Sequence, residues 1–333
     1  MIHSDVKHDT LPLHTPPKKR WRRMMFTLGM IALLVVALWL IGDFAYSRIT
    51  LAQLDRYEQS LSWDANGLRR GEGEFEMGAG HTALLLVHGI NFSPIAFRNF
   101  GPELAKHGFK CRAMRLPGFA GRVRDYADFK YPEWIIAIDR EVQTLAAEHD
   151  RVVVVAHSLG AAVVLRYLLE RQPKIAGVVL IAPAIEVSNA RSPVFSTRFW
   201  HEFSNRTLWF TSIVLSPFDY DVHDPEVIRT IPQKQFTPRA IVDQTFALID
   251  QNRGQASQMD VPLLMILSPS DQVIDTPAAE AYFNDWGTEK KTLLLQTRAG
   301  HLIPLDYGWQ DAVSAIVQFV DHKTSDKFSP AKP

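Results

Sequence analysis

Short runs of apolar residues recur along residues 80–320, and polar or small residues follow each run. Runs of this length that are rich in Val, Leu and Ile are typical of strands buried on both faces of a parallel sheet. Longer stretches between them, such as Leu159–Glu170, have the apolar spacing of helices. Strands that alternate with helices predict an α/β fold with a mostly parallel central sheet and flanking helices. The predicted strands are Ala83–Val87, Cys111–Leu116, Arg151–Ala156, Gly177–Ile181, Val261–Leu267 and Lys291–Gln296.

The third of these strands leads directly to a serine. Residues 152–160 read Val-Val-Val-Val-Ala-His-Ser-Leu-Gly, so a strand should turn sharply at Ser158 into a helix. A strained turn of this kind requires small side chains two positions before and after the serine, where Ala156 and Gly160 stand. The usual pattern is G-x-S-x-G, and Ala156 departs from it by one methyl group. This context predicts that Ser158 is a nucleophile; a serine that only caps the following helix is the alternative.

Polar residues also follow the ends of other predicted strands. His88, Asp271 and His301 each stand just beyond such an end, which is where open α/β sheets place their sites. The order Ser158, Asp271, His301 is the triad order of α/β-hydrolases. Over about residues 80–320 the chain therefore resembles the α/β-hydrolase superfamily, in particular its carboxylesterase and monoacylglycerol-lipase-like branch.

The resemblance implies roles for five residues. Ser158 attacks the substrate carbonyl, and His301 is the base that takes its proton. Asp271 holds the imidazole of His301 in the correct tautomer and stabilises its cation. The backbone N–H groups of Ile90 and Leu159 form the oxyanion hole. This chemistry requires no cofactor, and none is predicted.

A second aspartate competes with Asp271 for the acid's role. Asp275 follows four residues later, and Asp271 could instead cap the helix that begins near Pro277. We favour Asp271 because it lies closer to the end of its strand and has the D-x-V-I context of the family.

Other polar residues have simpler interpretations. His88 is expected to be a structural residue of the oxyanion loop, and His157 should point away from the nucleophile into the scaffold. Asp221, His223 and Asp224 lie close together beside a proline, which is more typical of a solvated loop than of a metal site. The sequence therefore predicts no metal ligands.

About eighty residues separate the strand at Gly177–Ile181 from the next one, far more than a plain connection needs. The segment Ala184–Met259 is therefore predicted to be an inserted cap. It is rich in aromatic residues, which suits an acyl or other apolar substrate group. Trp200 and Phe203 are the first candidates to bind that group; the alternative is that the aromatic residues form the cap's own small core.

The N-terminal region predicts a membrane anchor. Met24–Gly42 contains nineteen residues without a charge, close to the roughly twenty with which a helix crosses a bilayer. Lys18, Lys19, Arg20, Arg22 and Arg23 precede it. This excess of positive charge places the N-terminus in the cytoplasm and the catalytic domain on the other side, which is the periplasm in a Gram-negative cell. An uncleaved signal anchor is favoured over a cleaved signal peptide or a buried core helix, because the run exceeds the usual signal-peptide core of about 7–15 residues.

The predicted organisation has five parts. A basic cytoplasmic tail (1–23, with 1–17 disordered) precedes the transmembrane anchor (24–42). A membrane-proximal connector (43–79) follows, with a helix over Ile49–Leu68 and a short first strand within Arg69–His81. The hydrolase domain spans 80–320, with the cap at 184–259, and a frayed tail spans 321–333.

Composition narrows the possible partners. The 36 basic and 36 acidic side chains balance, so nothing indicates nucleic acid as a partner. The single cysteine, Cys111, excludes an intrachain disulfide framework. The predicted function is a membrane-anchored serine hydrolase that cleaves acyl or lipid-derived carboxylic esters through an acyl-enzyme on Ser158. A serine peptidase, thioesterase or acyltransferase of the same fold and a non-catalytic binding protein are the alternatives, and the oligomeric state is left open.

Overall fold

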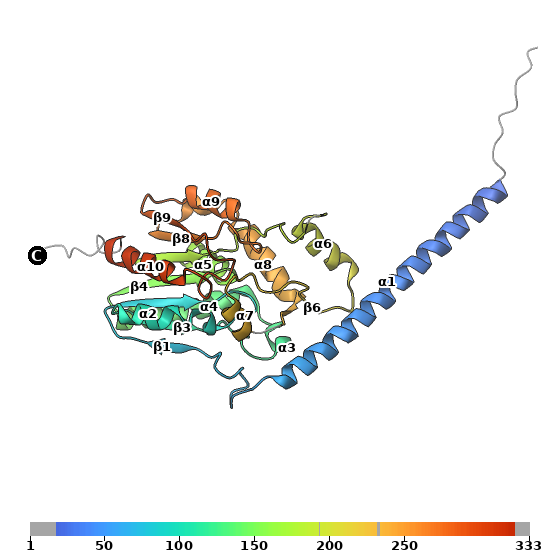
Figure 1. The fold of residues 1–333 in the computed structure, drawn as a ribbon. Helices are drawn as coiled ribbons and strands as arrows, with labels where there is room; N and C mark the ends of the chain where they lie inside the picture. Colours follow the sequence, from blue (N-terminus) through green and yellow to red (C-terminus); the bar gives the residue numbers. More distant parts are fainter. Residues whose placement is uncertain (1–17, 193, 232–233, 324–333) are drawn as a thin grey trace, which may run out of the picture.

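A seven-stranded sheet forms the centre of the protein in a computed structural model that describes residues 18–192, 194–231 and 234–323 (Figure 1). Its strand order is β1-β3-β2-β4-β5-β8-β9, with β1 antiparallel to β3 and all other neighbours parallel. The predicted α/β fold with a mostly parallel sheet is confirmed. The strands are β1 (Phe75–Met77), β2 (Thr82–Val87), β3 (Lys110–Met114), β4 (Arg151–His157), β5 (Gly177–Ile181), β8 (Leu263–Leu267) and β9 (Lys291–Leu295).

Helices between the strands pack against the sheet and one another. α2 contacts α10, and α5 contacts both α4 and α8 (Figure 1). The helices are α2 (Phe100–Lys106), α3 (Val123–Tyr126), α4 (Tyr131–Glu148), α5 (Leu159–Arg171), α8 (Arg239–Asn252), α9 (Thr276–Asn284) and α10 (Trp309–Lys323), with 3-10 turns η1 (Pro94–Phe97) and η2 (Ala256–Gln258). α10 thus continues to Lys323, inside the region predicted as a frayed tail. The predicted tail residues 1–17 and 324–333 lie outside the described residues.

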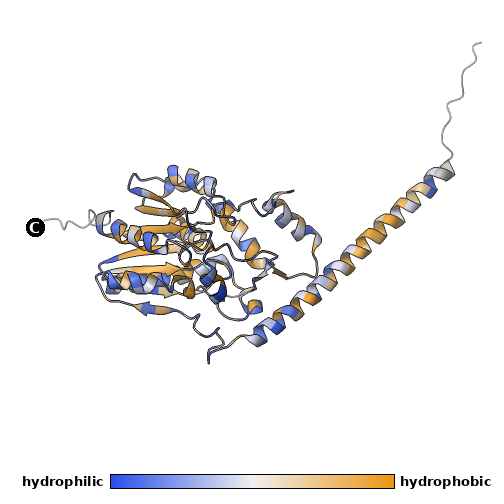
Figure 2. Ribbon diagram, viewed as in Figure 1, coloured by the Kyte–Doolittle hydropathy of each residue, from blue (hydrophilic) through white to orange (hydrophobic). Residues whose placement is uncertain are grey.

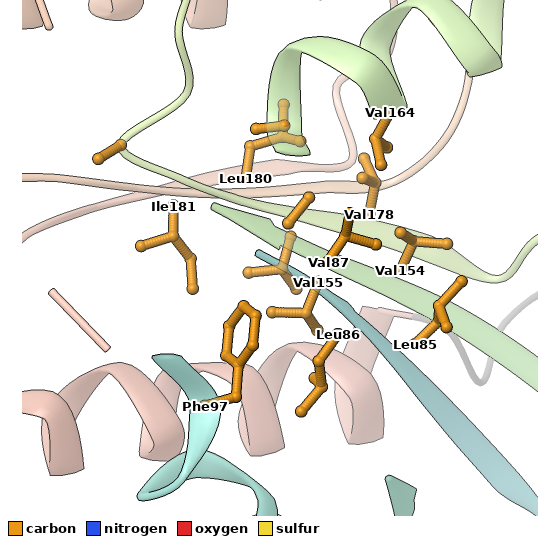
Figure 3. Packing of buried hydrophobic residues seen from close by; sticks show 14 of the residues in the cluster. Leu85, Leu86, Val87, Phe97, Val154, Val155, Val164, Val178, Leu180 and Ile181 are labelled. Carbon is orange, nitrogen blue, oxygen red and sulfur yellow. The ribbon is translucent and has the colours of Figure 1, made fainter. Parts of the chain in front are cut away.

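The core lies where the central strands meet these helices. Val154 and Val155 of β4, Leu85 and Leu86 of β2 and Phe97 of η1 are all fully buried (Figure 3). Burial of one such side chain contributes about 1.5–3 kcal/mol. The strands are therefore fixed in place, and the loops at their carboxyl ends start from a rigid base.

The chain between β5 and β8 carries the inserted elements. They are α6 (Thr197–Thr207), β6 (Ile213–Leu215), α7 (Pro225–Thr230) and β7 (Phe236–Pro238), and β6 pairs with β7 in an antiparallel ribbon. α8, the last helix of the predicted cap, packs on α5, and its Ile241 and Leu248 belong to the main core. This helix therefore supports the sheet as well as the insertion.

One long helix, α1 (Lys18–Ser60), contains both the apolar span and the first part of the predicted connector, residues 43–60. The connector helix predicted over Ile49–Leu68 is its continuation and ends eight residues earlier. Its apolar part has a mean hydropathy of 2.6, and none of that part is buried inside the protein (Figure 2). The buried-core alternative is thereby excluded. A membrane span and an N-terminal signal sequence both agree with this length and composition.

Candidate active site

Three predicted residues from distant parts of the chain meet at the carboxyl edge of the sheet. Ser158 Oγ lies 2.9 Å from His301 Nε2, and His301 Nδ1 lies 2.8 Å from Asp271 Oδ2. All three residues are buried. With its proton on Nδ1, His301 donates to the carboxylate and presents Nε2 as an acceptor to the serine hydroxyl. This is the hydrogen-bond chain through which a base activates a serine.

The turn between β4 and α5 sets the position of Ser158. Its backbone has φ 54° and ψ −120°, in the left-handed half of conformational space that a side chain disfavours. A Cβ at position 160 would lie 2.3 Å from the carbonyl oxygen of His88, so only glycine fits there. Ala156 is fully buried, and its methyl group is accommodated. The sequence Ala-x-Ser-x-Gly therefore forms the predicted strand–turn–helix.

The structure separates the two aspartates that competed for the role of acid. Asp271 Oδ1 accepts the N–H groups of Val273 and Ile274, while Oδ2 faces His301. Asp275 lies at the N-terminus of α9 and accepts the N–H of Ala278 at 2.9 Å. Asp275 is thus a helix cap, and Asp271 is the carboxylate beside the imidazole.

Electrostatics keep Asp271 in its charged form. Burial by itself raises the pKa of this carboxyl, but the charge of His301 and the hydrogen bonds from His301, Ile274 and Val273 outweigh burial. The net effect is a pKa below the usual value of the group. Asp271 is therefore ionised at neutral pH and able to stabilise an imidazolium.

The two predicted oxyanion donors flank the serine. Leu159 is the first residue of α5, so its N–H has no acceptor within the helix. Ile90 follows Gly89, and a Cβ on Gly89 would lie 2.9 Å from the Cβ of Ser158. The loop after β2 therefore passes close over Ser158, and both backbone N–H groups belong to segments that contact this residue.

The segment that contains these site residues was compared with known protein families. Residues 79–307 match the serine aminopeptidase S33 family of hydrolases. The chain belongs to this family. The predicted resemblance to the carboxylesterase and monoacylglycerol-lipase-like branch of the α/β-hydrolases is confirmed.

Three relatives illustrate the similarity. The thermostable monoacylglycerol lipase of Bacillus sp. (strain H-257) is 22% identical over 240 residues, which cover 72% of this chain and 90% of that protein. The crystal structure of Paleococcus ferrophilus monoacylglycerol lipase superposes with a TM-score of 0.63 at 20% identity, covering 75% of this chain and 98% of that one. A metagenome-derived lipolytic enzyme gives a TM-score of 0.64 at 17% identity, with coverage of 76% and 98%.

A residue interpreted from sequence as part of a solvated loop has a structural role in this hydrolase. Asp221 is 6% exposed, and its Oδ2 accepts the backbone N–H of Gln272 at 2.8 Å and of His301 at 3.0 Å. Gln272 adjoins Asp271. One carboxylate from the insertion thus joins the loop that carries Asp271 to the loop that carries His301, and the solvated-loop interpretation of Asp221 is wrong.

Asp306 completes this arrangement and was not recognised from the sequence. It is fully buried and accepts backbone N–H groups from His223, Asp224 and Gly300 at 2.7–2.9 Å. Asp221 and Asp306 therefore hold the insertion and the His301 loop together through backbone hydrogen bonds. The only sequence signal was an aspartate shortly after the catalytic histidine candidate. Within the described part of the chain no group of three or more His, Cys, Asp or Glu side chains is arranged to hold a metal ion.

The other two histidines near the hydrolase site are structural. His88 Nδ1 donates to the carbonyl of Gly89, and its Nε2 accepts the N–H of Leu116. His157 is buried and donates from Nε2 to the backbone carbonyl of His301 at 3.0 Å. Burial lowers the pKa of His88 to about 4 and that of His157 to about 3, so both are neutral supports.

The two aromatic candidates for acyl binding lie on α6. Trp200 is 45% exposed and packs against Phe199 and Phe203. Phe203 also contacts Trp39 of α1. A role of Trp200 and Phe203 in acyl binding remains a prediction, because their contacts are with one another and with the apolar helix.

Proposed function

We propose that this hydrolase cleaves carboxylic esters of acyl or lipid-derived substrates through an acyl-enzyme on Ser158. The observation that carries the proposal is the hydrogen-bond chain from Ser158 Oγ through His301 to Asp271. The strained backbone of Ser158 adds support, since strain of this kind costs roughly 1–3 kcal/mol and is kept at functional sites. A protein that only binds its ligand has no need of such an arrangement.

The proposed reaction has two halves. His301 Nε2 takes the hydroxyl proton as Ser158 Oγ attacks the ester carbonyl, and the N–H groups of Leu159 and Ile90 stabilise the oxyanion. His301 then gives its proton to the departing alcohol, which leaves the acyl group on Ser158. In the second half His301 activates a water molecule that releases the acid. Asp271 stabilises the imidazolium in both halves.

Engagement of three acidic side chains of the insertion within the protein favours esters over aminoacyl substrates. An aminopeptidase requires carboxylates that are free to bind the substrate's ammonium group. Asp221 accepts two backbone N–H groups, and Asp224 caps α7. Glu202 forms an ion pair with Arg206, with 3.5 Å between Oε2 and Nη1. The relatives described as monoacylglycerol lipases support the same choice.

A substrate panel tests this choice with the purified full-length protein in detergent. We expect monoacylglycerols and simple acyl esters to be hydrolysed with far higher kcat/KM than aminoacyl amides. Thioesters and an added alcohol acceptor measure the related thioesterase and acyltransferase activities. Preferential cleavage of aminoacyl amides would overturn the ester assignment and favour the peptidase.

We also propose that α1 is an uncleaved signal anchor with its N-terminus in the cytoplasm. The five basic residues before the span support this orientation. A reporter that is active only outside the cytoplasm, fused after Pro333, should be active, and the full-length chain should remain in membranes after alkaline washing. Release of a shortened soluble chain would show cleavage, and an inactive reporter would reverse the orientation.

A further inference from the structure

Helix α6 packs against the domain with its polar face rather than its apolar face. Arg198 donates to Asp250 at 3.1 Å, and both His201 and Asn205 bond to Asp243, within 2.6–2.7 Å. The two aspartates belong to α8. A helix on the surface of a water-soluble domain normally does the reverse and turns its apolar stripe inward.

The aromatic residues on α6 and next to its ends consequently face away from the domain. Phe195, Phe199 and Trp200 are 42–49% exposed, and no residue of α6 is buried. Trp209 and Phe210, just beyond the helix, are also exposed. The five aromatic side chains, here called the aromatic face, form a surface that requires an apolar or interfacial partner.

The apolar part of α1 lies beside this surface. The Trp39 ring packs edge-on against Phe203 with centroids 5.9 Å apart, and its Nε1 donates to the carbonyl of Thr207 at 2.9 Å. Phe44 packs on Phe210 in the same edge-on way, at 5.5 Å. The aromatic face and the apolar surface of α1 are therefore continuous.

A buried carboxylate fixes the two elements in register. Asp43 is 4% exposed; its Oδ2 accepts the N–H groups of Trp209 and Phe210, and its Oδ1 accepts the hydroxyl of Thr211. Ser47 donates to the carbonyl of Phe210 at 2.8 Å. The loop after α6 is thus bound to α1 where the uncharged span ends, so the insertion cannot slide along the helix without breaking these bonds.

The register places α6 at a defined depth. Trp39 precedes Asp43 by four residues, which is about 6 Å along a helix. If the uncharged span ends at the membrane surface, the α6 residues that contact Trp39 lie about this far below it. Amphipathic helices that bind in the plane of a membrane bury their apolar face by about 5–10 Å, and Trp is enriched at this level.

We propose that the aromatic face of α6 is a second membrane-binding surface, inserted into the interfacial layer of the same bilayer that α1 spans. The occupant of this surface is lipid rather than a second copy of the chain, because the face continues the apolar surface of the anchor. The proposal rests on the membrane anchoring proposed above. It places the insertion against the lipid in which a lipid-derived substrate would be dissolved.

Site-specific fluorescence quenching in phosphatidylcholine vesicles tests this proposal on the full-length chain. The one native thiol, Cys111, is buried, and burial raises its pKa to about 12, so it does not compete for labelling. A single reporter cysteine is placed by Phe199→Cys on the aromatic face, by Val35→Cys in the span or by Ile136→Cys on α4. Ile136 is the matched control, with 49% exposure against 42% for Phe199.

We expect lipids with a nitroxide near the headgroup to quench the label at position 199, and lipids with a nitroxide deep in the acyl chain to quench the label at position 35, which lies about 12 Å along the helix from Asp43. Both kinds of lipid should spare the label at 136. Quenching at 35 with position 199 behaving like 136 would overturn the proposal and leave the anchoring intact. No quenching at 35 would refute the anchoring itself and the proposal with it. If lipid does not quench the label at position 199, and the exposure of this label to water falls as the protein-to-lipid ratio rises, a second copy covers the face.

An activity measurement separates lipid contact from a structural role. The double variant Phe195→Ser with Phe199→Ser should hydrolyse a long-chain monoacylglycerol in vesicles several-fold more slowly, with unchanged turnover of a short, water-soluble ester. The control Ile136→Ser should change neither rate. Equal losses on both substrates would show that the aromatic residues support the fold and would overturn their assignment to lipid.

Discussion

Asp271→Asn is expected to remove almost all turnover while the fold remains intact. Asp271 Oδ1 accepts the N–H groups of Val273 at 2.7 Å and Ile274 at 2.9 Å, and Oδ2 faces His301 Nδ1. An asparagine must keep its carbonyl oxygen toward these two donors, so its NH₂ group takes the place of Oδ2. That group would donate to Nδ1, and His301 would then carry its proton on Nε2, where it can no longer accept the proton of Ser158.

The magnitude follows from this change of tautomer. The same substitution in a serine-protease triad, where the geometry stays intact, lowers kcat about 10⁴-fold, which corresponds to roughly 5 kcal/mol of barrier. We expect a loss of similar size here because all contacts of Oδ1 survive in the variant. The free energy of unfolding should change little, since the substitution preserves shape.

Asp275→Ala is the matched control. Asp275 accepts the N–H of Ala278 as the cap of α9, and loss of such a cap costs about 1 kcal/mol of stability. Turnover should not change. The assay pairs ester hydrolysis with urea unfolding for both variants. The reasoning is refuted if Asp271→Asn stays within about tenfold of wild type while folded, or if Asp275→Ala causes the larger loss of turnover.

Two further predictions concern the supports of the site. Asp221→Ala should lower kcat by up to about 10²-fold with little effect on KM, because the His301 loop loses an acceptor. Asp221→Asn should retain most of the wild-type kcat, and equal losses in the two variants would contradict a positioning role. The free energy of unfolding should fall as pH drops below about 6.5, by up to about 1.4 kcal/mol per pH unit for each neutral buried histidine. In the folded state the pKa is about 4 for His88 and about 3 for His157, so the unfolded chain binds protons first as the pH falls. Unfolding curves at pH 7.5 and 5.5 should show this loss of stability, and the loss should be smaller in His88→Gln.

Much of the sheet was predictable because its signals are local. Continuous apolar runs mark strands buried on both faces, and β5 has the predicted bounds while β2 and β4 differ by one residue at one end. The turn at Ser158 was predictable for the same reason, since its small neighbours stand at fixed offsets. The candidate acid and base followed from their places after strand ends.

The supports of the site had no local signal. Asp221 and Asp306 act by accepting backbone N–H groups from loops that are distant in sequence, so residue type alone does not reveal them. The orientation of α6 was equally hidden. Its aromatic spacing indicates an amphipathic helix, but only packing on α8 and α1 decides which face turns outward. The anchor and connector helices, predicted as two, form one continuous helix because no glycine or proline interrupts residues 43–60.

Labelling with a fluorophosphonate probe tests the central claim, that Ser158 is the nucleophile, most directly. The wild-type chain should bind one probe per molecule and lose ester hydrolysis as it does so. Ser158→Ala should show neither labelling nor hydrolysis, with unfolding behaviour like that of wild type. Labelling or turnover that persists in the folded Ser158→Ala variant would show that another residue carries the reaction, and would contradict the account.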